Sequence, residues 1–420
     1  MSKLCIQGGK RLSGDVVING AKNAAVAILP ATVLVDGISI IENLPDINDV
    51  GILKEAMTSL GAVTNFIDEH TLEIDASTVY QHVAKESCIS KMRASYYLLG
   101  ALLGRFGKAE VAMPGGCDFG GRPIDQHIKG FQALGAKIEV VDNVIRASAD
   151  KLVGTRIYLD VVSVGATINI MLAAVLAEGT TVIENVAKEP HIVDVANFLN
   201  MMGANVKGAG TDVIRIKGVE RLSGGRYSIV PDQIEAGTYM IAAAITGGDV
   251  NVRNIIPEHM ESLSSKMREM GIQIIEGDDF IRVVAPEKLI ATNVKTLPYP
   301  GFPTDLQPQM AILLTVAQGV STLIEGVFEN RFQYMEQLHQ TGAKITVEGN
   351  KATIEGVEKL KAAHLTATDL RAGAAMVLVG LIAEGGETVV HNTRYIDRGY
   401  ESIEDKLSAL GADIYRKPAQ

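Results

Sequence analysis

The hydrophobic and polar positions of this chain repeat one pattern at intervals of roughly 70 residues. Each repeat contains a stretch whose apolar residues recur at helical spacing and which ends at a glycine. A glycine at this place predicts a helix that ends in a left-handed C-cap. The glycines that mark the repeats are Gly61, Gly135, Gly203, Gly271, Gly342 and Gly411.

Short β-branched segments precede these helices, and hairpin-like pairs of segments follow most of them. The first kind reads ISIIEN, AEVAMP, TVIENV, VNVRNI, STLIEG and TVVHNT along the chain. The hairpins are clear in VTNFIDEHTLEID, AKIEVVDNVIRA, IQIIEGDDFIRVV and AKITVEGNKATIEG, where two alternating segments flank a polar turn. Each repeat is therefore expected to build a small sheet beside its amphipathic helix.

A second kind of helix is apolar on every side, and it completes each repeat. Its copies begin near AKNAAVAIL, KMRASYYLLGALL, SVGATINIMLAAVLA, DQIEAGTYMIAAAI, TDLQPQMAILLTVA and TDLRAGAAMVLVGLIA. A helix without a polar face is buried on all sides. We therefore expect these helices to pack inside and the sheets to lie outside.

The sixth repeat is cut short by the C-terminus after ADIYRK, and the N-terminal segment resembles the part that it lacks. LCIQGGKRLSGDVVI is similar to IRIKGVERLSGGRYSIV from the middle of the chain. The two ends are therefore expected to meet. We predict an α/β fold of two similar three-repeat domains, one spanning residues 21–229 and the other residues 1–20 plus 230–420.

Composition narrows the class of protein. A chain of 420 residues is too long for a single hydrophobic core, which agrees with two domains, and 47% hydrophobic residues allow ample burial. The net charge of −10 argues against non-specific nucleic-acid binding. Three cysteines form no disulfide framework, and we expect neither a signal peptide nor a membrane span. A cytoplasmic protein without nucleic-acid or membrane partners is expected.

The first turns of the apolar helices carry polar residues that such helices do not need. If the helices run in one direction, these turns gather at one mouth of each domain, where free N–H groups attract anions. Asp and Ser at these places are also ordinary N-caps. Capping does not explain Lys22 or Arg93, because a cation at a helix N-terminus costs about 0.3–1 kcal/mol. Either cation requires a ligand or a carboxylate beside it.

One glycine-rich loop, PGGCDFGGRPID, carries a single cysteine, Cys117. Pro123 fits the first position of a helix that continues through Ile124 and Ile128. A thiol before a helix N-terminus and near Arg122 favours the thiolate. A plain glycine-rich turn with an incidental thiol explains the loop equally well.

Two other classes of function fit parts of the pattern. Cys117 and His127 could be the nucleophile and base of a hydrolase, although a helix start separates them. Six repeats could also form a binding protein, but charged residues interrupt the inner helices and favour a small anionic ligand. Clustered Cys or His spacing for a metal is missing from the sequence, as are Rossmann and P-loop motifs, so we expect no metal and no cofactor.

Eight segments along the chain together resemble the enolpyruvyl transferases. They are GAKNAAVAILPA, KMRAS, PGGCDFGGRPID, SVGAT, FPTD, FENRF, TDLRAGAA and IDRGYE, in the family's order and over essentially the whole length. The resemblance is to the members that act on UDP-N-acetylglucosamine, since the cysteine loop and GAKNA are unlike the enolpyruvylshikimate phosphate synthases. It implies an inverted, inside-out α/β barrel fold. It also implies transfer of enolpyruvate from phosphoenolpyruvate to the sugar 3-hydroxyl with release of phosphate, the first committed step of peptidoglycan precursor synthesis.

The resemblance also assigns roles to residues. Cys117 matches the proton donor, which can form a 2-(S-cysteinyl)pyruvate-type adduct. Asp305 matches the residue that takes the sugar proton, although an N-cap of the following helix would explain it too. The residues matched to phosphoenolpyruvate and the rest of the catalytic set are Lys22, Arg122, Arg398, Asp369 and Arg371.

A second group of residues matches the nucleotide-sugar site. It includes His127 beside the uracil, with Arg331 expected near the catalytic residues. The remaining members are Asn23, Arg93, Arg122, Pro123, Ile124, Asp125, Gln126, Ser163, Val164, Gly165 and Val327.

The sequence departs from the family pattern at one place. Many relatives carry a lysine just before SVGAT, where this chain has Val161 and Val162. That change removes one cation from the diphosphate site. Because Cys117 is present, the resemblance implies covalent inhibition by the epoxide fosfomycin. The glycine-rich loop and the paired domains further suggest closure upon the sugar nucleotide.

Overall fold

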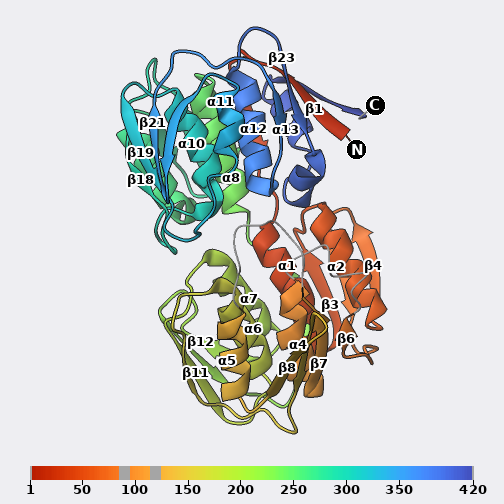
Figure 1. Cartoon of the computed structure of the whole chain (residues 1–420). Helices are drawn as coiled ribbons and strands as arrows, with labels where there is room; N and C mark the ends of the chain where they lie inside the picture. The colour runs from red at the N-terminus through yellow and green to blue at the C-terminus, as the bar shows by residue number, and fades with distance from the viewer. Residues whose placement is uncertain (1, 85–94, 114–123, 419–420) are drawn as a thin grey trace. The chain divides into compact units, whose positions relative to one another are not determined.

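The computed structural model describes residues 2–84, 95–113 and 124–418, and the chain divides into two compact units. Unit 1 consists of residues 1–19 and 231–420, and unit 2 of residues 20–230 (Figure 1). Each unit has its own hydrophobic core, and the two cores share no residue.

Each core is built around helices that lie inside the unit. Between Ala24 and Ala31 every residue of the first inner helix is buried, as the uniformly apolar sequence predicts. Figure 1 shows α8, α10 and α12 side by side within unit 1, and their mutual contacts agree. The inner helices of unit 2 are α1 (Lys22–Ala31), α4 (Tyr96–Phe106) and α6 (Val164–Ala174), and those of unit 1 are α8 (Gln233–Ile245), α10 (Gln307–Thr315) and α12 (Leu370–Ile382).

The described residues form six four-stranded sheets, three in each unit, with the same plan. One strand pairs in parallel with an edge strand on one side and antiparallel with a hairpin on the other. In unit 2 the sheets are β14-β3-β5-β4 (Leu222–Ser228, Val35–Glu42, Thr71–Asp75, Val63–Asp68), β6-β7-β9-β8 (Val83–Ala84, Lys108–Ala112, Val144–Ser148, Lys137–Val141) and β10-β11-β13-β12 (Arg156–Tyr158, Thr180–Glu184, Val213–Lys217, Asn205–Lys207). In unit 1 they are β16-β17-β15-β2 (Gln273–Glu276, Phe280–Val284, Asp249–Arg253, Ser13–Val17), β18-β19-β21-β20 (Val294–Lys295, Val320–Ile324, Lys351–Glu355, Lys344–Glu348) and β22-β23-β1-β24 (His364–Thr366, Glu387–His391, Ser2–Gln7, Asp413–Pro418).

Each amphipathic helix lies, along the chain, between the parallel-paired strand of a sheet and the next strand of the same sheet, and the helices end as predicted. The six marker glycines all have φ between 85° and 106°, which is the left-handed region that a C-cap glycine supplies. The amphipathic helices are α2 (Asn48–Ser59), α5 (Asp125–Ala133), α7 (Pro190–Met201), α9 (Glu261–Glu269), α11 (Met335–His339) and α13 (Ile403–Ala409), with 3-10 turns η1 (Thr32–Leu34), η3 (Pro257–Met260), η4 (Thr304–Leu306) and η5 (Thr393–Arg398).

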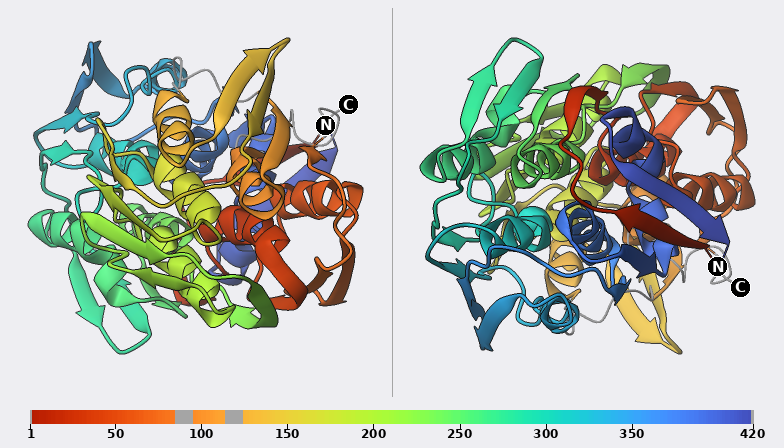
Figure 2. Two further views of the ribbon diagram at one scale, coloured as in Figure 1. Left: turned by 90° about the horizontal axis from the view of Figure 1, so that it is seen from below. Right: turned by 90° about the horizontal axis from the view of Figure 1, so that it is seen from above.

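The two chain ends meet in one sheet, as the similarity of the N-terminal segment to the middle of the chain predicts. Strand β1 pairs antiparallel with β24, from Ser2 opposite Pro418 to Gln7 opposite Asp413. Figure 2 (right) shows these two terminal strands side by side. Strand β2 pairs in parallel with β15 in another sheet of the same unit. The N-terminus thus supplies the strands that the sixth repeat lacks.

The residue directly after the parallel-paired strand differs between the copies in an informative way. Four of these strands, β3, β11, β15 and β23, are followed by asparagine with φ between 56° and 59°: Asn43, Asn185, Asn254 and Asn392. Three of the asparagine amides donate to a backbone carbonyl of the adjacent segment at 2.6–2.8 Å. The strand β19 is followed by Glu325 instead.

Within the described residues, the search for a helix of membrane-spanning length and hydropathy found none.

Candidate active site

A buried charged cluster of unit 1 centres on Asp305, in the turn η4 before α10. Arg331 donates to Asp305 Oδ1 and Arg371 donates to Oδ2, each at 3.0 Å. Both guanidinium groups are buried, whereas the Asp305 side chain remains 27% exposed. One carboxylate is therefore held by two arginines from separate elements, with part of its surface accessible to a ligand.

The two arginines dominate the electrostatics of this carboxylate. Burial alone would raise the pKa of Asp305, but the charges of Arg371 and Arg331 and their hydrogen bonds outweigh it and hold the pKa well below its ordinary range. The Asp305 carboxylate is therefore ionised throughout the physiological range. It can therefore accept a hydrogen bond from a ligand at any working pH.

Several first-turn residues serve as the N-caps that the sequence allowed. Asp232 Oδ1 accepts from the amides of Ile234 and Glu235 at 2.7 and 3.1 Å. Asp369 caps α12 in the same way, and Ser163 Oγ accepts from the amide of Ala166 at 3.2 Å.

The alternative explanation of Asp305, as the N-cap of the following helix, is wrong. Helix α10 begins at Gln307 without a side-chain cap, because the chain enters it through the turn η4. Asp305 lies inside that turn, and its carboxylate accepts from Arg331 and Arg371. Arg371 therefore has Asp305 as a side-chain partner.

Arg398 is the last residue of η5, and it is half-buried. It belongs to the same unit as Asp305, Arg331, Asp369 and Arg371. Glu235, which shares its helix start with Asp232, is 3% exposed and binds Lys406 Nζ at 2.6 Å and the amide of Asn19 at 3.0 Å. Glu235 is thus engaged in holding the structure of unit 1.

In unit 2, Lys22 begins α1 and forms an ion pair with Asp49. The Lys22 Nζ lies 2.9 Å from Asp49 Oδ2; the Lys22 side chain is 12% exposed and that of Asp49 is fully buried. Asp49 belongs to the first turn of α2. The carboxylate that a cation at a helix N-terminus requires is therefore present, and Asn23 is the next residue of α1.

The N-terminus of α6 faces His127 from α5. Ser163 is its N-cap and Val164 and Gly165 begin the helix, where an added Cβ on Gly165 would lie 3.0 Å from His127 Nε2. His127 Nδ1 lies 2.9 Å from the side-chain amide nitrogen, Nδ2, of Asn169. Burial lowers the pKa of His127 to about 4, so the imidazole is neutral at physiological pH.

Helix α5 begins at Asp125, two residues later than the sequence suggested, with half-buried Ile124 as its N-cap residue. Gln126 is buried; its amide donates to Asp125 and Asp160, and its oxygen accepts from the amide of Asp160 at 2.9 Å. Gln126 thus fixes the segment before SVGAT. Val161 and Val162, which stand just before SVGAT, are 57% and 41% exposed.

Four of the expected site residues lie outside the described residues: Cys117, Arg93, Arg122 and Pro123. Val327, expected near the sugar, is 40% exposed and follows β19 in unit 1. Its backbone N–H donates to Glu325 Oε1 at 2.8 Å.

Two residues of these clusters escaped the sequence analysis. Asp49 occurs among the apolar positions of its helix, and an acidic residue that is out of place in that pattern is the signal that could have revealed it. Glu325 replaces the asparagine that follows the strand in four other copies, so comparison of the repeats could have revealed it.

The sequence of this chain matches a known protein family over nearly its whole length. The family model of EPSP synthase (3-phosphoshikimate 1-carboxyvinyltransferase) matches residues 6–407. The chain therefore belongs to the enolpyruvyl transferase family.

Relatives over the full length narrow the position within this family. The chain is 58% identical to UDP-N-acetylglucosamine 1-carboxyvinyltransferase 2 of Clostridium acetobutylicum over 418 residues, covering 99% of this chain and 100% of the relative. It is 56% identical to UDP-N-acetylglucosamine 1-carboxyvinyltransferase of Clostridium botulinum, again over 99% and 100% of the two chains.

Solved structures agree with the predicted inverted α/β fold. The enolpyruvyl transferase NikO from Streptomyces tendae superposes with a TM-score of 0.90 at 25% identity, covering 100% of this chain and 99% of that one. EPSP synthase from Acinetobacter baumannii gives a TM-score of 0.79 at 18% identity over the full length of both chains, which bears on the fold alone.

Proposed function

We propose that this chain transfers the enolpyruvyl group of phosphoenolpyruvate to the 3-hydroxyl of UDP-N-acetylglucosamine and releases phosphate, the step that commits this sugar to peptidoglycan precursors. The observation that carries the proposal is the full-length identity of 56–58% to carboxyvinyltransferases of this sugar nucleotide. The ionised Asp305 between two buried arginines supports it, because the reaction needs an acceptor for the proton of the sugar hydroxyl.

The chemistry divides into addition and elimination. Cys117 gives its proton to C3 of the enol, C2 becomes electrophilic, and the sugar oxygen forms a bond to C2 while its proton passes to Asp305. Transfer of a proton from C3 to the Cys117 thiolate then restores the double bond and expels phosphate, which takes the proton held by Asp305. A low pKa makes Asp305 a weak base in the free protein, so proton transfer is favourable only once the hydroxyl oxygen bonds to C2.

Cations and helix termini would hold the anionic groups of the two substrates. Lys22, Arg122 and Arg398 are assigned to the phosphate and carboxylate of phosphoenolpyruvate, where guanidinium groups can bind in a bidentate manner. Asp369 caps the helix that carries Arg371 and so orients that arginine. The free N–H groups at the start of α6 suit the diphosphate of the nucleotide.

His127 is unsuited to serve as the base in the hydrolase alternative. His127 is bound through Nδ1 to Asn169, it is 7% exposed, and its pKa is lowered to about 4. An imidazole in this state is a poor general base for a thiol at neutral pH.

The direct test is release of phosphate from phosphoenolpyruvate with and without UDP-N-acetylglucosamine. We expect release only when both are present. Cys117→Ala is expected to lower turnover by at least about 100-fold, the usual size of a general-acid contribution, while binding of the sugar nucleotide persists. Cys5→Ala is the matched control, since Cys5 is a buried cysteine of β1, and it should retain wild-type turnover.

Fosfomycin provides a second arm of the same test. Incubation with the epoxide should abolish turnover of the wild type and of Cys5→Ala over time, and should add the mass of one inhibitor molecule. Cys117→Ala should acquire no added mass. Phosphate release that is independent of the sugar nucleotide, or full turnover of Cys117→Ala, would refute the proposed function or the proton-donor assignment respectively.

A further inference from the structure

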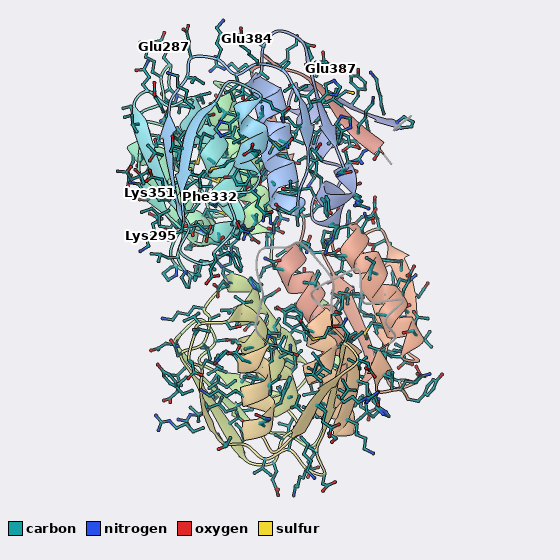
Figure 3. The ribbon with its side chains drawn as sticks, in the orientation of Figure 1. Glu287, Lys295, Phe332, Lys351, Glu384 and Glu387 are labelled. Atoms are coloured by element: carbon teal, nitrogen blue, oxygen red, sulfur yellow. The ribbon has the colours of Figure 1, made fainter. Side chains whose placement is uncertain are left out.

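We propose that Glu325 is a positioning residue for the Asp305 cluster: its buried carboxylate fixes Thr304, and through Thr304 it fixes the arginine that holds Asp305. This inference rests on the proposed function, because it assigns Glu325 to the reaction that Asp305 serves. Figure 3 labels Lys295 and Lys351, the two register partners of Ile324 at the end of β19, and Glu325 is the residue directly after that strand.

Comparison of the repeats shows that the fold alone does not require a carboxylate here. Asn43, Asn185 and Asn254 occupy the corresponding place after their strands, and each neutral amide donates to a backbone carbonyl of the adjacent segment. Those carbonyls belong to Ile229, Leu159 and Ile18. The corresponding residue beside β19 is Thr296, because its N–H pairs with the last strand carbonyl in the same manner as theirs.

The carboxylate of Glu325 receives four hydrogen bonds and is 2% exposed. Oε1 accepts from Thr296 Oγ1 at 2.7 Å and from the amides of Val327 and Phe328 at 2.8 and 3.1 Å. Oε2 accepts from Thr304 Oγ1 at 3.0 Å. In the described part of the chain no cation forms an ion pair with Glu325, so neutral donors stabilise its charge.

The direction of these hydrogen bonds links Glu325 to Asp305. Arg331 is only a donor, so its bond to Thr304 Oγ1, at 3.0 Å, obliges that hydroxyl to accept. The hydroxyl proton of Thr304 is then available to donate to Glu325 Oε2. The other terminal nitrogen of Arg331 donates to Asp305 at 3.0 Å. One arginine therefore spans the threonine that Glu325 orients and the carboxylate assigned to the sugar proton.

Phe328 adds a second link between the same groups. Its amide is bound by Glu325, and its ring lies 5.1 Å from the guanidinium carbon of Arg331, within cation–π range. Glu325 thus fixes two of the surfaces that Arg331 contacts, Thr304 and Phe328. An amide in place of the carboxylate would present N–H groups to Thr304, so that hydroxyl would have to accept from two donors and its own proton would lose its acceptor.

The test uses the full chain with Glu325→Gln, which preserves shape and removes charge. We expect kcat to fall about tenfold or more while KM for each substrate changes less than about threefold, as for a group that orients the reacting residues after binding. Glu184→Gln is the matched control: it makes the same chemical change on the strand β11, where Glu184 pairs with the exposed Arg156, and it should leave kcat unchanged.

Thr304→Val provides an independent variant that removes the linking hydroxyl. It should lower kcat similarly, and the double variant should lose no more than about threefold beyond the larger single loss, because both changes break one link. A crystal structure of Glu325→Gln should show the Arg331–Asp305 hydrogen bond lengthened or lost.

Each outcome decides between the alternatives. Wild-type protein that releases no sugar-dependent phosphate would overturn the proposed function and this inference together. An active wild type whose Glu325→Gln and Thr304→Val variants keep kcat, even with a lower melting temperature, would leave the proposed function intact and overturn the positioning role. If Glu325→Gln fails to fold, Thr304→Val alone decides, and an unchanged kcat then refutes the proposal.

Discussion

Two of the buried ion pairs in the described part of the chain differ in how much they leave open to a ligand. Lys22 forms an ion pair with Asp49, whose side chain is fully buried. Asp305 is shared by two arginines and remains partly exposed. Burying an ion is costly, and removing one partner of a buried pair leaves the charge of the other uncompensated. Each pair must therefore be complete before a substrate arrives.

The pair in unit 2 yields a stability prediction. Asp49→Asn leaves Lys22, which is 12% exposed, without its carboxylate, and should lower the free energy of unfolding by about 2–4 kcal/mol. Urea denaturation at pH 7 measures it. Glu178→Gln, which removes the exposed partner of Lys151, is the control and should cost less than about 1 kcal/mol. Equal losses for the two variants would show that Lys22 does not depend on Asp49.

At the scale of elements, close packing between the inner helices of unit 2 determines which substitutions the unit tolerates. Gly100 of α4 faces α6, where its amide donates to Asn169 Oδ1 at 2.9 Å. A Cβ at Gly100 would lie 2.4 Å from the backbone oxygen of Asn169. The same Asn169 binds His127 of α5, so one asparagine joins three helices. The two helix backbones approach closely because this position carries no side chain.

The effect of a methyl group should therefore depend on which helix receives it. Gly100→Ala should destabilise the protein by about 2 kcal/mol or more, since a clash with backbone cannot be relieved by a rotamer change. Gly51→Ala in α2 meets nothing within 4 Å and should stabilise by about 0.5–1 kcal/mol through helix propensity. Urea unfolding of the two variants side by side measures both signs. A stable Gly100→Ala would mean that α4 and α6 separate easily.

The elements were predictable because their signals are local. The marker glycines, the uniformly apolar helices and the hairpins each depend on neighbours in sequence, and the caps Ser163, Asp232 and Asp369 lie at a fixed offset from the helix start. The resemblance to a family provided Asp305 and Arg371, but local pattern gave Asp305 the wrong contact. A 3-10 turn displaces it from the cap position, and no residue spacing encodes that turn.

The contacts that escaped prediction all join distant segments. Asp49 meets Lys22 across two helices, Arg331 reaches Asp305 from the segment after β19, and Glu325 binds threonines from two other segments. Their partners are determined by how the repeats pack, which no single stretch of sequence contains. The repeats themselves do contain one usable clue, the glutamate that replaces asparagine after β19.

At the scale of the whole molecule, the acid stability of the chain is a sum of buried groups with opposite signs. His127 has a pKa of about 4 against an ordinary 6.5, because burial disfavours its charged form. The unfolded chain binds more protons than the folded one between these values, so this contribution is lost as pH falls from 6.5 to 4. Burial raises the pKa of Asp194 from 3.8 to about 6, despite hydrogen bonds from Tyr227 and Val230. The folded chain binds more protons there, so stability is lost as pH rises from 3.8 to 6.

The opposite effects of His127 and Asp194 on stability therefore offset each other in the wild type. Substituting one residue at a time should reveal each effect. From pH 7 to pH 4.5, the stability of His127→Asn relative to wild type should rise by about 2 kcal/mol, and that of Asp194→Asn should fall by a similar amount. Urea unfolding at both pH values gives the differences, in which the pH-independent cost of each substitution cancels. Parallel pH profiles for wild type and both variants would mean that neither side chain titrates differently on unfolding, and that the acid response of this chain arises elsewhere.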